Sequence, residues 1–270
     1  MAEGAAHLVD RVFPEVPVRQ WVLTVPHRLR YMVAWDHDLC RAVVGVFMRA
    51  VLGWLRRRAQ VEQGIAGGRS GAVAIIQRFG AALNVNVHTH ALVLDGVFAE
   101  DATGTLVFHQ APPPDGEALD ALLGTIARRI ERLLVRLGVW TAHAESAVGD
   151  PWAEAAPVLA GLAAVSVQGR LALGPRAGGE VRRCGNLPDE PPLPMVRGPC
   201  HAVQGGFDLD AGVVVPARDR AHLERVCRLC GAPHKRHCVN WREEAVHGAC
   251  RPSSTCCRTR RASPRCSRTS

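Results

Sequence analysis

Residues 84–96 read NVNVHTHALVLDG, and this stretch decides the fold. Polar and apolar residues alternate over its first eight positions, an apolar run follows, and Asp95 and Gly96 form a turn signal. An alternation with a period of two predicts a β-strand, in which successive side chains point to opposite faces of the sheet. His88 and His90 are two residues apart, so we expect both imidazoles on the same face.

The segments on either side continue a mixed pattern of strands and helices. The short connection at 80–83 favours an antiparallel hairpin between 72–79 and 84–94. Further strands are predicted at 18–25, 104–109 and 208–216, and helices at 38–60, 116–138, 151–164 and 217–228. This order predicts an α+β protein with a largely antiparallel sheet and helices packed on one face.

Charge and cysteine divide the chain into two parts. Eleven Lys/Arg against two Glu give residues 225–270 a formal charge of +9, which leaves about −1 of the total +8 for residues 1–224. Seven of the ten cysteines also follow Val226. Residues 229–270 contain one leucine and no Ile, Phe or Met. This is too little apolar area to offset the loss of chain entropy on folding. We therefore predict a domain at 1–228 and a disordered tail at 229–270.

The tail has two interpretations. Cysteine and histidine spacings that could suit a zinc module occur at Cys227, Cys230, His234, His237 and Cys238. The interpretation that we favour is translation of a shifted reading frame, because the composition changes abruptly and the later cysteines show no second paired ligand pattern. Zinc is therefore not an expected cofactor of this chain.

The sequence predicts neither a membrane span nor an N-terminal signal peptide. No run of 18 or more apolar residues occurs, so no membrane span is expected. The first residues lack the charged-then-apolar layout of a signal peptide. We expect a cytoplasmic protein by default.

The histidine pair has two interpretations, a metal site and a purely structural one. Neutral imidazole is a common ligand for divalent metals, so His88 and His90 could present two adjacent nitrogens to one ion. The alternative is a pair of polar residues on the solvated face of a half-buried sheet. The spacing alone does not decide between them, because a His-x-His motif is short.

Longer blocks around the pair carry a family resemblance. They read RQWVLTVPHRLRYMVAWD (19–36), WLRRRA (54–59), GAVAIIQRFGAALNVNVHTHALVLDGVF (71–98) and GGFDLDAGVVVPARDRAHLERVCR (205–228). Together they resemble the rolling-circle insertion-sequence transposases, a branch of the HUH (His-hydrophobic-His) nuclease group. The resemblance covers about residues 1–228 and implies an HUH palm-like sheet.

The resemblance also implies a mechanism and its partners. In such proteins the histidine pair and a third polar ligand hold Mg²⁺ or Mn²⁺, here His88, His90 and, as the candidate third ligand, Gln77 on the paired strand. The ion polarises a phosphate of single-stranded DNA at an insertion-sequence end. A tyrosine then attacks, forms a 5′-phosphotyrosine link and allows rejoining.

Three departures from the family pattern bear on activity. Thr89 stands between the histidines where a bulky apolar residue is usual, and Asp210 stands where a histidine is expected. The family's tyrosine lies well downstream of the pair, whereas the only tyrosine of this chain is Tyr31. Tyr31 fits a packing or DNA-stacking role better than that of nucleophile. The similar proteins also carry a zinc segment before the position of Met1, so we expect a copy truncated at both ends and inactive.

Other functions remain open at this level. The chain could be a non-catalytic remnant that binds single-stranded DNA or a full-length transposase, and a small metallohydrolase would need only the histidine pair. The candidate DNA-binding cations are Arg28, Arg30, Arg56, Arg57 and Arg58. A plain solvated surface is the alternative for each of them.

Overall fold

The main sheet has six strands in the described part of the chain. The computed structural model describes residues 2–79, 85–140, 157–167, 170, 174–175, 177–178, 199–230 and 238–242. The strands are β1 (Val18–Thr24), β2 (Gly71–Phe79), β3 (Val85–Leu94), β6 (His201–Gln204), β7 (Phe207–Val215) and β8 (Cys238–Arg242). Their order is β6-β7-β1-β3-β2-β8, and every pair is antiparallel. The predicted α+β class and the predicted β2–β3 pairing are confirmed.

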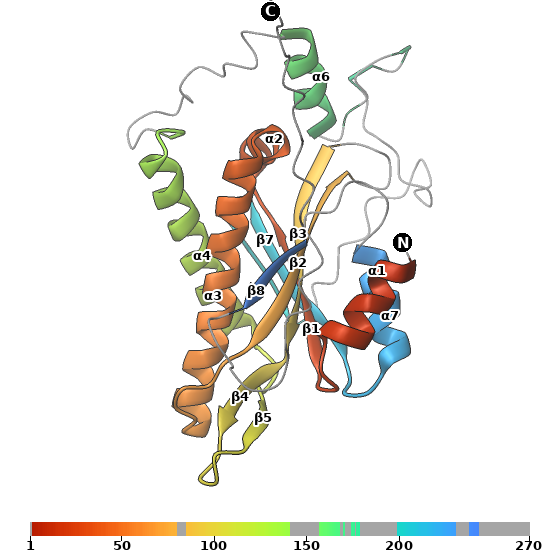
Figure 1. Cartoon of the computed structure of the whole chain (residues 1–270). Coiled ribbons are helices and arrows are strands. Elements are labelled where there is room, and N and C mark those ends of the chain that lie inside the picture. Colours follow the sequence, from red (N-terminus) through yellow and green to blue (C-terminus); the bar gives the residue numbers. More distant parts are fainter. Residues whose placement is uncertain are drawn as a thin grey trace, which may run out of the picture.

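A small second sheet continues from β3. β4 (Gly96–Glu100) pairs with β5 (Leu106–Gln110) and extends beyond one end of the main sheet (Figure 1). The first residue of β4, Gly96, has no room for a side chain, because a Cβ at this position would lie 2.2 Å from the carbonyl oxygen of His109. The turn signal in the sequence is therefore a tight passage from one sheet to the other.

Three helices cover one face of the main sheet. They are α2 (His27–Trp35), α3 (His37–Gln63) and α4 (Gly116–Arg136). The N-cap of α3 is Asp36, whose carboxylate accepts hydrogen bonds from the backbone N–H groups of Asp38 and Leu39, as an N-cap should. Gly64 ends the helix in the left-handed conformation, with φ of 70°. Apolar side chains of these helices and of the sheet form the larger core.

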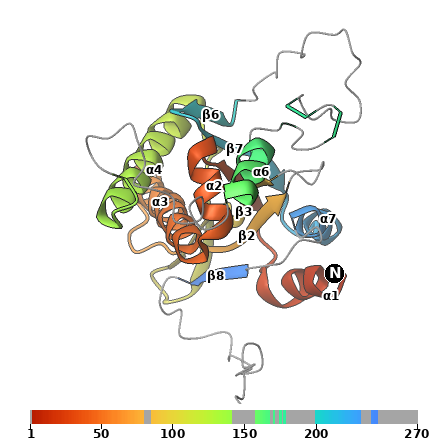
Figure 2. The same cartoon turned by 90° about the horizontal axis from the view of Figure 1, so that it is seen from above.

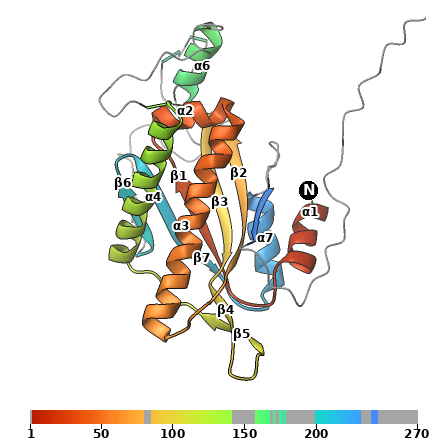
Figure 3. The ribbon, with the colours of Figure 1, turned by 60° about the vertical axis from the view of Figure 1, so that its left-hand side comes forward.

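Helices also lie on the opposite face, which corrects the expectation that they pack on one face only. α1 (Ala2–His7), the adjoining π-helical turn η1 (Leu8–Val12) and α7 (Arg220–Cys230) lie on that side, as Figures 2 and 3 show. The reason is a second apolar cluster, in which Val9, Val226 and Cys227 pack with Val73 and Leu92 of the sheet. A shorter helix, α6 (Pro157–Val167), contacts α2 and β3.

The strand β8 corrects a second expectation. No regular structure was predicted after Arg228, yet residues 238–242 pair with β2, with Cys238 opposite Ile75 and Arg242 opposite Gly71. Without this partner β2 would be an edge strand with unpaired backbone groups. The other tail residues, 231–237 and 243–270, lie outside the described residues, and so do His234 and His237.

A buried ion pair joins three strands. The Arg19 guanidinium donates to both carboxylate oxygens of Asp95, at 2.8 and 2.9 Å, and to the carbonyl oxygen of Ala211 at 2.9 Å. Each charged side chain is 4% exposed. The pair connects β1, β7 and the end of β3, the strand that carries the two histidines.

Candidate metal centre

The sheet face that carries the histidines is apolar at one end and polar at the other. Its apolar end includes Val73 and Leu92 and is covered by α1, η1 and α7. Beyond Leu92 the next residues of β3 on this face are His90 and His88, and Gln77 lies opposite His88 on β2. The candidate site therefore begins where the apolar cover on this face ends.

His88 and His90 project from the same face, as the alternation predicted. Their rings are neighbours, with centroids 4.8 Å apart and planes inclined by 65°. β3 lies between β1 and β2, so the pair stands on an inner strand with backbone partners on both sides. Thr89, between them, is buried on the other face at 7% exposure, so the apolar place of the motif is filled by a buried threonine.

Two glutamine amides hold the imidazole of His90. Its Nε2 is 3.1 Å from Oε1 of Gln77, and its Nδ1 is 2.8 Å from Nε2 of Gln20. In this arrangement Gln20 donates to Nδ1, and Nε2–H donates to Gln77. Amide orientations and histidine tautomers are assigned from the hydrogen-bond network. If the amide of Gln20 is turned so that its oxygen faces His90, the ring carries its proton on Nδ1. The lone pair of His90 Nε2 is then available to a metal.

The imidazole of His90 is held neutral. Burial, and secondarily the neighbouring His88, lower the pKa of His90 to about 4. A neutral ring has a lone pair available to a cation without first losing a proton.

The lowered pKa predicts acid sensitivity of the metal-free protein. The unfolded chain binds a proton at His90 below about pH 6.5, whereas the folded chain does so only below about pH 4, so stability is lost as the pH falls between these values. We expect this residue to remove about 1–2 kcal/mol of the free energy of unfolding between pH 7.5 and 5. Urea titrations in a chelator would measure it. The His90→Gln variant should lack this part of the slope; an unchanged slope would contradict the assignment.

The residues present fit a divalent ion. Two imidazoles and the amide oxygen of Gln77 supply nitrogen and oxygen donors, a set that suits Mn²⁺ and, with water completing the shell, Mg²⁺. Among the described residues no group of three or more His, Cys, Asp or Glu could hold a metal. The third protein ligand here would therefore be an amide rather than a carboxylate.

Comparison with known proteins places the chain in a family. A family model described as "Putative transposase" matches residues 71–233, more than half of the 270 residues. The chain belongs to this transposase family. The match includes the β2–β3 hairpin with its histidine pair, and also β7 and α7. No curated protein and no solved structure gives a significant match.

Asp210 of the transposase lies apart from the histidine pair. It pairs in register with Val22 of β1, which in turn pairs with His90 of β3. Two strand spacings therefore separate Asp210 from His90, roughly 10 Å. Asp210, which stands where a histidine was expected, is therefore too far from His88 and His90 to be a ligand of the same ion.

A second polar group occupies the same face at β6 and β7. Nε2 of His201 is 3.0 Å from a carboxylate oxygen of Asp208. Arg30 lies near Asp208: burial lowers the pKa of Arg30, and the carboxylate partly offsets that effect. The Nε–H of Arg30 donates to the carbonyl oxygen of Val25 at 2.8 Å. Arg30 therefore has a local structural role beside any DNA contact.

The other predicted site residues lie on the helices α2 and α3. Tyr31 lies half-buried on α2, and its hydroxyl oxygen is buried. Arg56, Arg57 and Arg58 lie on α3, which covers the opposite face of the sheet. Arg58 stacks 4.7 Å above the Trp54 ring and pairs with Glu62 at 2.6 Å. Arg28 is exposed on α2, and DNA contacts by these cations stay predictions.

The end of α7 lies beside the candidate site. The amide of Gln20, which holds His90, also donates to Sγ of Cys230 at 3.2 Å. Burial, and then Cys227, raise the pKa of Cys230 to about 12, so its thiol stays protonated. Cys227 and Cys230 therefore belong to the apolar cluster under α7 in the described part of the transposase. The described helices include none long and apolar enough to cross a membrane.

Proposed function

We propose that the chain is a transposase of the rolling-circle HUH type, a class that nicks and rejoins single-stranded DNA at insertion-sequence ends, and that this copy is inactive. The observation that carries the proposal is the side-by-side placement of His88 and His90, with the amide of Gln77 hydrogen-bonded to His90. This constellation lies inside the region that the transposase family matches. The resemblance of the longer sequence blocks supports the rolling-circle subtype.

The metal-binding part of the proposal concerns three residues. His88, His90 and Gln77 would hold Mg²⁺ or Mn²⁺. When bound, the ion supplies polarisation of the scissile phosphate and stabilises charge on the leaving oxygen. Gln20 orients the ring of His90 through Nδ1, as partners of metal-bound histidines commonly do.

The nucleophile part of the proposal concerns Tyr31. It is the only tyrosine in the sequence, and its hydroxyl oxygen is buried on α2. A phenol that solvent does not reach is poorly placed to attack a DNA phosphate. We therefore propose that this copy keeps the metal site and lacks strand-cleaving activity.

A covalent-adduct assay tests the nucleophile. Purified protein incubated with Mn²⁺ and a labelled single strand carrying an insertion-sequence end should give no 5′-phosphotyrosine adduct on a denaturing gel. The Tyr31→Phe variant is the matched control and should behave in the same way. An adduct that forms with the unmodified chain and disappears in Tyr31→Phe would contradict inactivity and make Tyr31 catalytic.

A second candidate function is DNA binding without chemistry. The buried Tyr31 hydroxyl favours it, because a chain that keeps the sheet but lacks an accessible nucleophile can still hold a strand or a full-length transposase. Mn²⁺-dependent retention of single-stranded DNA without any cleavage would support this function. Cleavage without a covalent intermediate would instead favour a metallohydrolase.

A further inference from the structure

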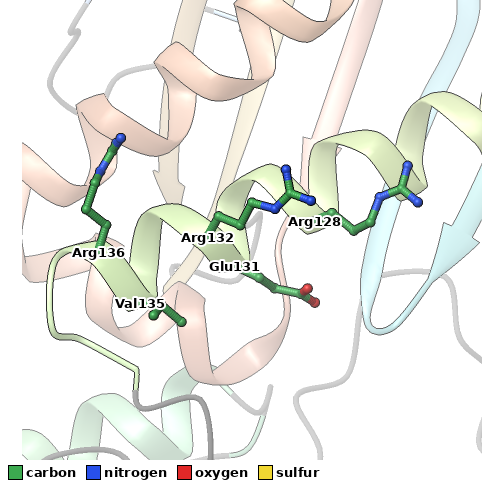
Figure 4. A pocket seen from close by; sticks show the side chains of 5 residues that line it. All are labelled: Arg128, Glu131, Arg132, Val135 and Arg136. Carbon is green, nitrogen blue, oxygen red and sulfur yellow. The ribbon is translucent and has the colours of Figure 1, made fainter.

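A groove between α3 and α4 is lined by arginines. The hollow of about 300 Å³ is bordered by Arg49 of α3 and by Arg129, Arg132 and Arg136 of α4. A second hollow of about 340 Å³ adjoins it on α4, where Arg128 and Glu131 are further lining residues. Figure 4 shows the side chains of Arg128, Glu131, Arg132, Val135 and Arg136 along one stretch of α4. We call the two hollows together the arginine groove.

The groove carries a strong positive charge. Five arginines stand against one carboxylate, that of Glu131, which gives a formal charge of +4. None of the ion pairs among the described residues includes Arg129, Arg132 or Arg136. The main body of the chain is close to neutral, so this concentration of charge is local.

The arrangement costs helix stability. Arg128, Arg132 and Arg136 follow one another at intervals of four, so successive guanidinium groups are neighbours on one side of α4 and repel each other. The helix dipole favours cations only in the last turn, which accounts for Arg136 but not for Arg128. A polyanion in the groove would offset this repulsion.

We infer that the arginine groove binds the phosphate backbone of duplex DNA, a second DNA contact on the sheet face opposite the histidine pair. DNA is the polyanion favoured by membership of a transposase family. Single-strand sites usually offer aromatic side chains on which bases stack, and none of the described residues that line the groove is aromatic. The inference rests on the proposed function only in that the partner is DNA.

Two double variants, each of which removes two positive charges, test the inference. Arg132→Gln/Arg136→Gln removes two groove cations, and Arg11→Gln/Arg41→Gln removes two exposed cations on η1 and on the first turns of α3. Fluorescence anisotropy with a labelled random-sequence duplex is recorded over a range of NaCl concentrations. The groove variant should bind at least about tenfold more weakly near 0.1 M salt, and its log–log salt slope should fall by about 2. The control variant should stay near the parent.

Three further measurements sharpen the result. Glu131→Gln should raise duplex affinity severalfold, because it removes the carboxylate of the groove. A labelled oligo(dT) strand should lose little affinity in the groove variant, and an equal loss on both probes would overturn the assignment to duplex DNA. Unchanged duplex binding in Arg132→Gln/Arg136→Gln would overturn the groove itself. Circular dichroism checks that each variant is folded.

The histidine variant separates this inference from the proposed function. His88→Asn/His90→Asn leaves the groove intact, so its duplex affinity should equal that of the parent even though metal binding is lost. A failed metal test would leave the duplex result standing, and a failed duplex test would leave the metal site standing.

Discussion

Replacing Asp95 with alanine is expected to lower the free energy of unfolding by about 3–5 kcal/mol. The variant leaves the Arg19 guanidinium buried without its anion, while its hydrogen bond to the carbonyl oxygen of Ala211 stays. When a buried charge loses its partner, no interaction offsets the free energy that it cost to remove the charge from water. Both side chains are 4% exposed, so solvent cannot take over the interaction.

Urea unfolding followed by circular dichroism would measure this loss. The matched control is Glu224→Gln on α7, which breaks the exposed pair between Glu224 and Arg228. Exposed pairs of this kind contribute about 0.5 kcal/mol or less. A loss at Asp95 no larger than the loss at Glu224 would show that the Arg19–Asp95 pair does not hold the three strands together.

The second large effect concerns metal affinity. His88→Asn/His90→Asn should weaken Mn²⁺ binding by at least about 100-fold, since changes to outer partners of a metal site already cost about 10–100-fold. Gln20→Ala removes only the amide that orients His90, so its loss should be smaller, about tenfold. This graded order is the expected signature of a site in which Gln20 positions a ligand.

Calorimetric titration with Mn²⁺ would compare these variants. His201→Asn is the matched control, because His201 lies on the same polar end of the sheet but pairs with Asp208 instead of the histidine pair. It should retain the parent affinity. Equal losses in His201→Asn and in the His88/His90 variant would indicate a general effect of histidine content rather than a site.

Local sequence pattern predicted much of the fold. The alternation around His88 and His90 placed the pair on one face of a strand, and the Asp36 cap and the apolar period of 38–60 located α3 to within a few residues. Both features depend on neighbours in the sequence. The β2–β3 pairing followed from the short connection between the two strands. These elements could be predicted because turn length and side-chain period fix their geometry locally.

Contacts between distant segments could not be predicted in this way. Gln20 is 70 residues from His90, and only the register of β1 against β3 brings the amide to the ring. The same holds for the arginine groove, since Arg49 and Arg132 line one hollow only through the packing of α3 on α4. The helices α1 and α7 cover the second face of the sheet only because they pack against each other. The periodicity of the sequence within each segment does not predict this contact.

The most direct test of the central claim is pulsed electron paramagnetic resonance of the Mn²⁺-loaded protein. Electron spin echo modulation reports the nitrogen nuclei bonded to the ion. We predict the couplings of two imidazole nitrogens in the parent, one in each of the single variants His88→Asn and His90→Asn, and none in the double variant. A parent spectrum without imidazole coupling, or one that the double variant leaves unchanged, would contradict a metal centre at His88 and His90.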